Sequence, residues 1–276
     1  MRDAAVTATP THGRVLIVAG SDSGGGAGIQ ADIKAVTALG GYAMTAITAL
    51  TAQNTLGVHG VQPTPLDFIA QQIDVVVDDL GVDCVKTGML ATTEVIETVA
   101  DRLDAKAAKA AVVVDPVMVA KGGHPLLAAA AVAAMREIMV PRASLLTPNV
   151  PEAEALTGLT IAGGDDLRRA GEALLAQGAS AVLMKGGHLD GPQVTDLLVA
   201  PDGVTVFEGP RIATRHTHGT GCTTASAIAA GLAQGMDLAA AVGRARAYVQ
   251  VAIASAPGYG HGHGPLNHVH TVMADP

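Results

Sequence analysis

The feature that most limits the fold of this chain is an alternation of short aliphatic runs with longer segments of helical periodicity. Glycine or polar residues follow most of the aliphatic runs before the next helical segment starts. Such runs are typical of strands covered on both faces in a parallel sheet. Strands that alternate with helices favour an α/β fold, a three-layer α/β/α arrangement with a mostly parallel central sheet. Strands are predicted at residues 14–19, 43–50, 84–86, 111–115, 144–147 and 181–185.

The helical segments and one late hairpin complete the predicted architecture. A Pro-Asp-Gly turn at 201–203 separates two β-rich segments, 195–199 and 205–207, and therefore predicts a hairpin. No linker, low-complexity stretch or internal repeat divides the chain, so we expect a flexible N-terminal tail at 1–13 and a single domain at 14–276. Helices are predicted at residues 29–39, 66–80, 92–111, 125–139, 165–177 and 238–255.

The composition fits a large aliphatic core and argues against several classes of function. Hydrophobic residues make up 49% of the chain and charged residues 15%, and there is no Trp, so small and aliphatic side chains must fill the core. The net charge of −8 and the lack of a basic block argue against nucleic-acid binding. No apolar run approaches the roughly 18 residues of a membrane helix. Two cysteines far apart give no disulfide framework, which fits a cytoplasmic protein.

A glycine-rich turn that leads into an alanine-rich helix, residues 216–230, is the clearest candidate for a ligand site. Gly219 and Gly221 allow a tight turn and a close approach of the backbone to a ligand. The unpaired N–H groups and the dipole at a helix N-terminus favour a bound anion. Cys222 lies at this terminus, where we expect the pKa of a thiol to fall. Taken alone, the pattern fits equally well a tight loop with a small buried cysteine.

Polar side chains gather at the ends of the predicted strands. In an open α/β sheet, ligands bind beyond the carboxyl ends of the strands, so these side chains should share one site. An anion site with carboxylates and lysines around it suits phosphoryl transfer, in which Mg²⁺ and positive groups neutralise charge on phosphate. The P-loop pattern Gly-x4-Gly-Lys-[Ser/Thr] does not occur in the chain. The residues in question are Asp22, Asp32, Gln53, Asn54, Lys86, Asp115, Asn149, Glu152, Lys185 and His188.

A series of sequence blocks, taken in order, closely resembles one enzyme family. Together the blocks are similar to the bacterial hydroxymethylpyrimidine/phosphomethylpyrimidine kinases of thiamine biosynthesis, which have a ribokinase-like fold. The resemblance covers about residues 15–270. Any one block would be a weak signal, but their order makes the resemblance specific. The blocks are AGSDSGGGAGIQAD at 19–32, ITALTAQNT at 47–55, KTGML at 86–90, VDPVM at 114–118, LTPNVPEA at 146–153, MKGGH at 184–188 and THGTGCT at 217–223.

The resemblance implies two ATP-dependent phosphorylations of one pyrimidine, first of its hydroxymethyl group and then of the monophosphate. It implies that Gln53 hydrogen-bonds the aminopyrimidine edge, which suits an amide with both a donor and an acceptor. It also implies that Asp32 lies near polar groups of the substrate and that Met89 and Val117 line the ring pocket. Ordinary structural roles, as a helix-start Asp and as core side chains, are the alternatives for these three residues.

The resemblance also implies roles for the catalytic and nucleotide-binding residues. Cys222 matches the proposed base, and a backbone anion hole is implied at Gly219, Thr220 and Gly221. A thiol is an unusual base for an alcohol, but a loose transition state does not need early removal of the hydroxyl proton. The resemblance further implies that ATP and Mg²⁺ are held by Lys185, Asn149, Thr217, Glu152 and Asp115, with Glu152 and Asp115 near the metal, if necessary through water.

Several alternatives remain open at this stage. The same fold supports pyridoxal or pyridoxine kinases, and the chain could also be an inactive vitamin-binding module or a salvage kinase that stops at the monophosphate. The resemblance favours a homodimer. Segments near Gln53 and at 117–125 are candidates for a lid, the second because of its Lys121-Gly-Gly turn. The histidine-rich segment 260–270 could be a metal tract, but a Gly-His-Gly-x-Gly-Pro segment is a feature of the similar kinases as well.

Overall fold

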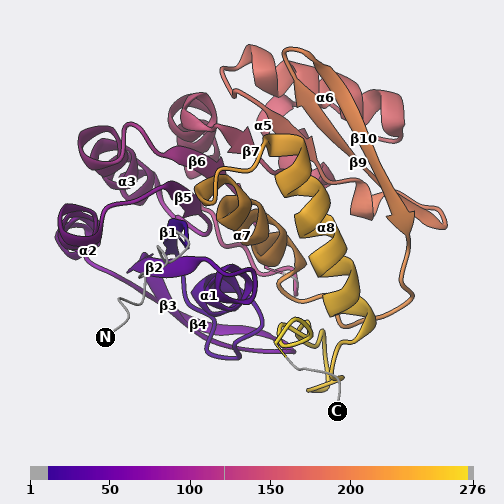
Figure 1. Cartoon of the computed structure of the whole chain (residues 1–276), viewed down its shortest axis with the longest axis horizontal. Coiled ribbons are helices and arrows are strands. Elements are labelled where there is room, and N and C mark those ends of the chain that lie inside the picture. Colours follow the sequence, from indigo (N-terminus) through magenta and orange to yellow (C-terminus); the bar gives the residue numbers. More distant parts are fainter. Residues whose placement is uncertain (1–11, 121, 273–276) are drawn as a thin grey trace, which may run out of the picture.

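A central sheet of eight strands organises the computed structural model, which describes residues 12–120 and 122–272 (Figure 1). The strand order is β10-β9-β8-β7-β6-β5-β1-β2, and all neighbours are parallel except at β9, which is antiparallel to both β8 and β10. The strands are β1 (Arg14–Ala19), β2 (Tyr42–Ile47), β5 (Cys84–Thr87), β6 (Ala111–Val114), β7 (Leu145–Leu146), β8 (Val182–Met184), β9 (Gln193–Ala200) and β10 (Gly203–Pro210).

Helices cover both faces of this sheet, which confirms the predicted three-layer α/β/α fold (Figure 1). One face carries α1 (Gly28–Ala38), α7 (Thr220–Ala233) and α8 (Leu238–Ala254). The other face carries α2 (Leu66–Leu80), α3 (Thr93–Lys106), α4 (Ala131–Ala134), α5 (Val150–Thr157) and α6 (Gly164–Ala176).

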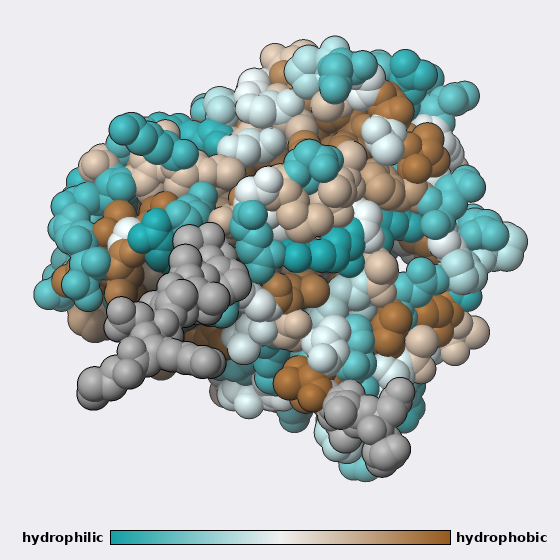
Figure 2. All heavy atoms as spheres, in the orientation of Figure 1, coloured by the Kyte–Doolittle hydropathy of each residue, from teal (hydrophilic) through white to brown (hydrophobic). Residues whose placement is uncertain are grey.

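The first strand shows how the aliphatic runs build both interior layers. Successive side chains of a strand point to opposite faces, so Leu16 and Val18 pack toward α2 while Val15 and Ile17 pack toward α7. All four side chains are fully buried. On the molecular surface seen in Figure 2, apolar side chains occur in scattered groups among polar ones. Among the described residues, none of the helices combines the length and the apolar character needed to cross a bilayer.

The carboxyl ends of the parallel strands meet at one edge of the sheet. Strands β1, β5, β6 and β7 run in the same direction, and α7 packs across β1, β5 and β6. The residues that follow these strands therefore lie close to the first turn of α7. This arrangement sets the position of the candidate site.

Two predicted elements differ in the structure. The predicted strand at 43–50 is divided at Thr48, whose buried hydroxyl donates to the carbonyl of Met89 at 2.7 Å. The chain then forms a separate two-stranded hairpin, β3 (Ala49–Asn54) with β4 (Gly57–Pro63), so the polar segment at 51–55 is mostly strand. The register shifts between Ala52 and Gln53, which gives this hairpin an irregularity next to Gln53.

The predicted helix at 125–139 begins later than expected. Pro125 pairs with Val119 in an isolated bridge, and the N–H groups of Leu126 and Leu127 both donate to the carbonyl of Met118, which holds this stretch outside a helix. The helix starts with α4, continues as a π-helix at Met135–Met139 and ends as a 3₁₀ turn at Val140–Arg142. The predicted helix at 92–111 ends at Lys106 because residues 111–114 already belong to β6.

The late hairpin and the remaining predicted helices are confirmed, with ends shifted by at most three residues. The tail prediction concerns residues 1–13, of which 1–11 lie outside the described residues. Gly13 contacts the start of β2, since its carbonyl accepts the N–H of Tyr42 at 3.0 Å.

Candidate active site

The first turn of α7 approaches the glycine loop that follows β1. Gly219 precedes this helix with φ of +81°, and a Cβ added to Gly219 would lie 1.8 Å from the carbonyl oxygen of Gly26. Both the left-handed backbone and this contact require glycine. The amides of the first helical turn have no partner inside a helix, and that of Thr220 makes only a long contact of 3.3 Å with the Thr217 carbonyl, so this terminus can bind an anion.

An aspartate–lysine pair lies beside this terminus. The Nζ of Lys185, which follows β8, donates to Oδ1 of Asp115, which follows β6, at 3.0 Å. A Cβ placed on Gly221 would lie 3.4 Å from that Nζ and 3.7 Å from Oδ2 of Asp115. The Lys185 side chain is 16% exposed. A positive group therefore stands next to the backbone amides of α7, where both can face one phosphate.

Glu152 lies at the start of α5 close to the same pair. Its carboxylate accepts the N–H of Asn149 at 2.8 Å, while the Asn149 side chain accepts the N–H of Glu152 at 2.9 Å, which forms a capping box. Burial raises the pKa of Glu152 to about 7; the Lys185 charge opposes this rise and the Asp115 charge adds to it. A bound cation would favour the ionised form of this carboxyl group. Two oxygen donors in such a place fit a Mg²⁺ ion that keeps several waters.

A second aspartate–lysine pair is wholly enclosed. The Nζ of Lys86 in β5 lies 3.0 and 2.9 Å from the two carboxylate oxygens of Asp32 in α1, and Ser226 of α7 donates to the same carboxylate at 2.7 Å. Burial lowers the pKa of Lys86, but the charges of Asp32 and other acidic groups nearby and the hydrogen bond to Asp32 together outweigh burial and keep the pKa above its ordinary value. The Asp32 side chain has no exposed surface, so it faces Lys86 and Ser226 and not a ligand pocket.

Cys222 does not have the low pKa that its place at a helix N-terminus predicts. Burial raises the pKa of this thiol to about 12, and the charges of Asp32 and Asp115 contribute to the rise. The Lys86 charge and the N–H of Gly28 act in the opposite direction but do not overcome burial. The expectation of a lowered pKa was therefore wrong, because desolvation of the thiolate outweighs the helix terminus. The resting thiol is protonated.

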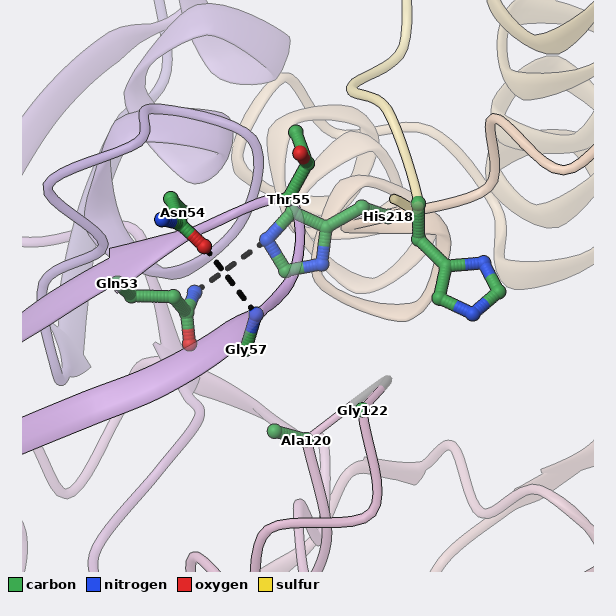
Figure 3. A pocket seen from close by; sticks show the side chains of 8 residues that line it. Gln53, Asn54, Thr55, Gly57, Ala120, Gly122 and His218 are labelled. Atoms are coloured by element: carbon green, nitrogen blue, oxygen red, sulfur yellow. Dashed lines mark hydrogen bonds between the residues drawn. The ribbon is translucent and has the colours of Figure 1, made fainter. Parts of the chain in front are cut away.

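A small pocket lies at the tip of the β3–β4 hairpin (Figure 3). Gln53 and His218 meet there, with Gln53 Nε2 lying 3.3 Å from His218 Nε2. Ala120 and Gly122 face them from across the pocket. The two predicted lid segments therefore line one pocket, although Lys121 itself lies outside the described residues.

The positions of the other predicted site residues do not by themselves indicate a contact with a ligand. Met89 is buried, and its sulfur would lie 3.0 Å from a Cβ added to Gly20 in the loop after β1. Val117 is half-buried beside Asp115, to whose carbonyl its N–H donates at 2.8 Å. The carbonyl of Thr217 accepts the hydroxyl of Thr220 at 2.8 Å. The roles of these side chains toward a ligand stay predictions.

The sequence analysis assigned no role to three residues that the structure places in or beside the site. Lys86 was noted only as a polar residue at a strand end, although a lysine inside a buried strand indicates a buried partner of opposite charge. The sequence around Ser226 and His218 indicates their roles less clearly. Ser226 sits four residues after Cys222, on the same face of α7, and His218 lies inside the glycine-rich turn. Their partners are nearly two hundred residues away in the sequence.

The histidine-rich segment, residues 260–270, packs against the hairpin tip and the glycine-rich turn before α7. The N–H of His263 donates to the carbonyl of Thr55 at the hairpin tip, and the carbonyl of Gly264 accepts the N–H of His218. A Cβ on Gly262 would lie 2.0 Å from the carbonyl oxygen of Thr55, which explains the glycine. Within residues 12–120 and 122–272, no three His, Cys, Asp or Glu side chains are grouped to hold a metal ion by themselves. The metal-tract alternative therefore has no support.

Comparisons with known proteins agree with this geometry. A sequence model of the phosphomethylpyrimidine kinase family matches residues 22–267. The chain is 52% identical, over 80% of its length and 82% of the relative, to hydroxymethylpyrimidine/phosphomethylpyrimidine kinase of Bacillus subtilis. It is also 52% identical, over 94% of its length, to the thiamine biosynthesis bifunctional protein ThiED of Geobacter sulfurreducens, of which it covers 52%.

Among solved structures, an ADP complex of Bacillus subtilis pyridoxal kinase has a TM-score of 0.88 and 37% identity, over 95% of this chain and all of that one. This likeness fits the alternative reading as a pyridoxal kinase, but the sequence identity to the pyrimidine kinases is higher. The predicted fold and the predicted kinase function are confirmed. Because a single family model spans most of the chain and a relative is 52% identical over most of both sequences, the chain belongs to the phosphomethylpyrimidine kinase family and is a phosphotransferase.

Proposed function

We propose that the chain transfers the γ-phosphoryl group of ATP to the hydroxymethyl group of 4-amino-5-hydroxymethyl-2-methylpyrimidine, and then phosphorylates the resulting monophosphate. The observation that carries this proposal is the meeting of the α7 terminus with the Lys185–Asp115 pair. The family match and the ADP complex of a solved structural neighbour support ATP as the donor.

The backbone amides at Gly219, Thr220 and Gly221 are suited to stabilise charge on the transferring phosphoryl group. Phosphoryl transfer depends mainly on positioning and charge neutralisation, and a helix terminus supplies both without rearrangement. Lys185 adds a full positive charge beside the same amides. Thr217 and Asn149 flank this region and are proposed contacts to ATP.

We assign Cys222 the task of orienting the attacking hydroxyl group. A protonated thiol cannot remove the hydroxyl proton, and the pKa of Cys222 is about 12. In a loose transition state the new phosphorus–oxygen bond can form while the oxygen still carries its proton. The bond from phosphorus to the leaving oxygen of ADP breaks in the same step. The proton then passes to a phosphate oxygen of the product.

Asp115 and Glu152 are proposed to hold Mg²⁺, in part through water. Burial and the Asp115 charge raise the pKa of Glu152, and a bound cation would oppose both effects. Mg²⁺, when bound with ATP, would neutralise phosphate oxygens. Because these two carboxylates are too few to enclose an ion, phosphate oxygens and waters would complete its coordination.

The direct test incubates the purified protein with Mg-ATP and, in separate reactions, the hydroxymethylpyrimidine, its monophosphate or pyridoxal. We expect mono- and diphosphates of the pyrimidine by mass spectrometry. Cys222→Ala should lower turnover by about 10²-fold, while Cys84→Ala, the matched cysteine at the start of β5, should not. Turnover of pyridoxal alone would replace the proposal by the vitamin B6 alternative, which the structural likeness to a pyridoxal kinase favours. Turnover that ends at the monophosphate would leave only the salvage reaction.

We also propose that the protein works as a homodimer in the cytoplasm. Both cysteines are free, which fits a reducing compartment. The hairpin and the start of α2 expose large apolar side chains, among them Leu50, Val61 and Phe68, which a second subunit could cover. Light scattering of the purified protein would test the dimer, and a monomer at micromolar concentration would contradict it.

A further inference from the structure

His218 lies where four segments that are distant in sequence meet. Its ring Nε2 lies 2.9 Å from Oδ2 of Asp22. The same nitrogen lies 3.3 Å from Nε2 of Gln53, a contact that is drawn in Figure 3. Its backbone N–H donates to the carbonyl of Gly264 at 3.2 Å. The residue is buried, and a Cβ on Gly26 would lie only 2.6 Å from the ring carbon Cδ2. The ring is therefore held in one place from several sides.

The state of Asp22 decides where the ring carries its proton. The Asp22 carboxylate accepts the N–H groups of Gly24, Gly26 and Ala27 at 2.8 to 3.0 Å. Burial raises the pKa of Asp22, but the contacts with His218 and with these amides outweigh burial and lower it overall. An ionised carboxylate only accepts hydrogen bonds, so His218 must present a proton on Nε2. A nitrogen that carries a proton has no lone pair for the NH₂ group of Gln53.

We propose that His218 is a positioning residue that fixes the amide of Gln53 with its carbonyl oxygen toward the ring and its NH₂ group toward the pocket. A half-turn of the amide exchanges its nitrogen and oxygen and keeps the shape of the side chain. The N–H of His218 is then shared between Asp22 and Gln53 as a three-centre hydrogen bond. This arrangement removes the clash of two donors.

The fixed orientation of the Gln53 amide determines which pattern of hydrogen-bond donors and acceptors a ligand must present. This part of the inference rests on the proposed function. The NH₂ group of Gln53 donates to an acceptor, such as the ring nitrogen of an aminopyrimidine. The second lone pair of the Gln53 oxygen stays open to the exocyclic amine, which then lies on the side nearer His218. A ligand with a donor in place of that ring nitrogen should be rejected.

The first test examines the free protein and needs no turnover. Nitrogen-15 NMR of the histidine side chains, assigned by comparison with His218→Gln, reports which ring nitrogen of His218 carries a proton. We expect a proton on Nε2 and no proximity between the Gln53 NH₂ protons and the His218 ring. A lone pair on Nε2, or an NH₂ group against the ring, would overturn the proposal even if the protein is an active kinase.

The second test compares matched variants by steady-state kinetics with the pyrimidine. His218→Leu removes the ring donor and should raise KM by about 10-fold with little change in kcat, whereas His218→Gln, which keeps an N–H donor, should recover most of the affinity. His12→Leu is the control, because the exposed His12 contacts the carbonyl of Gly40 and does not line this pocket. Equal KM changes in His218→Leu and His12→Leu, or a loss confined to kcat, would contradict the proposal. No turnover by the unaltered protein would instead refute the proposed function and leave the NMR result standing.

Discussion

Two aspartate–lysine pairs lie near the first turns of α7, and their surroundings differ sharply. Asp32 and Lys86 are fully enclosed, both carboxylate oxygens contact the ammonium group, and Ser226 adds a third hydrogen bond. Asp115 and Lys185 share a single 3.0 Å contact, and Lys185 keeps part of its side chain in solvent. Glu152 adds a further carboxylate beside the second pair.

The difference shows how the same two residue types can serve structure or ligand binding. A buried charge needs all its partners in place, so the Asp32–Lys86 pair ties α1, β5 and α7 together and has no free capacity for a ligand. The Lys185 side chain is partly exposed, and its ammonium group lies near the backbone of Gly221. Because only one of its three N–H donors is used by Asp115, the others can bind a phosphate without breaking the ion pair.

The largest expected effect is the loss of stability in Lys86→Met. This substitution leaves the Asp32 carboxylate buried without its cation, which should lower the free energy of unfolding by about 3–5 kcal/mol. Urea denaturation followed by circular dichroism would measure the loss. The double variant Asp32→Asn/Lys86→Met removes both charges and should recover much of it. A single variant as stable as the unaltered protein would show that the pair does not have the structural role inferred above.

Lys185→Met should give the opposite balance, with a large loss of activity and a smaller loss of stability. Removal of one positive group at the transferring phosphate typically costs about 10²–10³-fold in kcat. The Lys185 side chain is 16% exposed whereas that of Lys86 has no exposed surface, and Asp115 keeps the hydroxyl of Thr147 at 3.2 Å, so the loss of stability should be smaller than in Lys86→Met. Kinetics and denaturation of the same preparation would test the contrast, which fails if the two lysine variants lose stability equally.

Ser226→Ala tests how much the hydrogen bond from α7 to Asp32 contributes to stability. The hydroxyl donates to a buried carboxylate, and loss of a hydrogen bond to a charged group costs about 1.5–3 kcal/mol. Thr224→Ala is the matched control on the same helix, since the Thr224 hydroxyl donates only to the carbonyl of Thr220. The midpoint of thermal unfolding should fall further for Ser226→Ala; equal shifts would contradict the role given to Asp32.

A pH dependence of stability is expected beside the Asp115–Lys185 pair. The pKa of Glu152 is about 7 in the folded protein and 4.5 as its ordinary value, so the folded state binds a proton more tightly than the unfolded state. Stability should therefore fall as the pH rises from about 4.5 to 7. Glu152→Gln should flatten this slope, while Glu172→Gln on the exposed surface of α6 should leave it in place. An unchanged slope in Glu152→Gln would contradict the raised pKa.

Most strands and helices could be predicted from the sequence because each follows from a pattern in a few neighbouring residues. The aliphatic runs predict buried strands, and the Pro-Asp-Gly turn predicts the β9–β10 hairpin, since both follow from a few neighbouring residues. The prediction placed the start of the helix that begins with α4 too early. The bridge between Val119 and Pro125 and the hydrogen bonds to the carbonyl of Met118 hold the preceding stretch outside a helix, and hydrophobic periodicity does not reveal such contacts.

The candidate site also has features that local motifs predict and features that depend on distant contacts. The sequence by itself determined the family, the strand-end carboxylates and lysines, and the glycine turn at Gly219, because each is a local motif. Only the tertiary structure decided that Asp32 faces Lys86, that the Cys222 thiol stays protonated and that His218 holds Gln53. Burial and contacts across nearly two hundred residues set these properties, and the free energy of a charge or proton depends on the whole surroundings and not on its sequence neighbours.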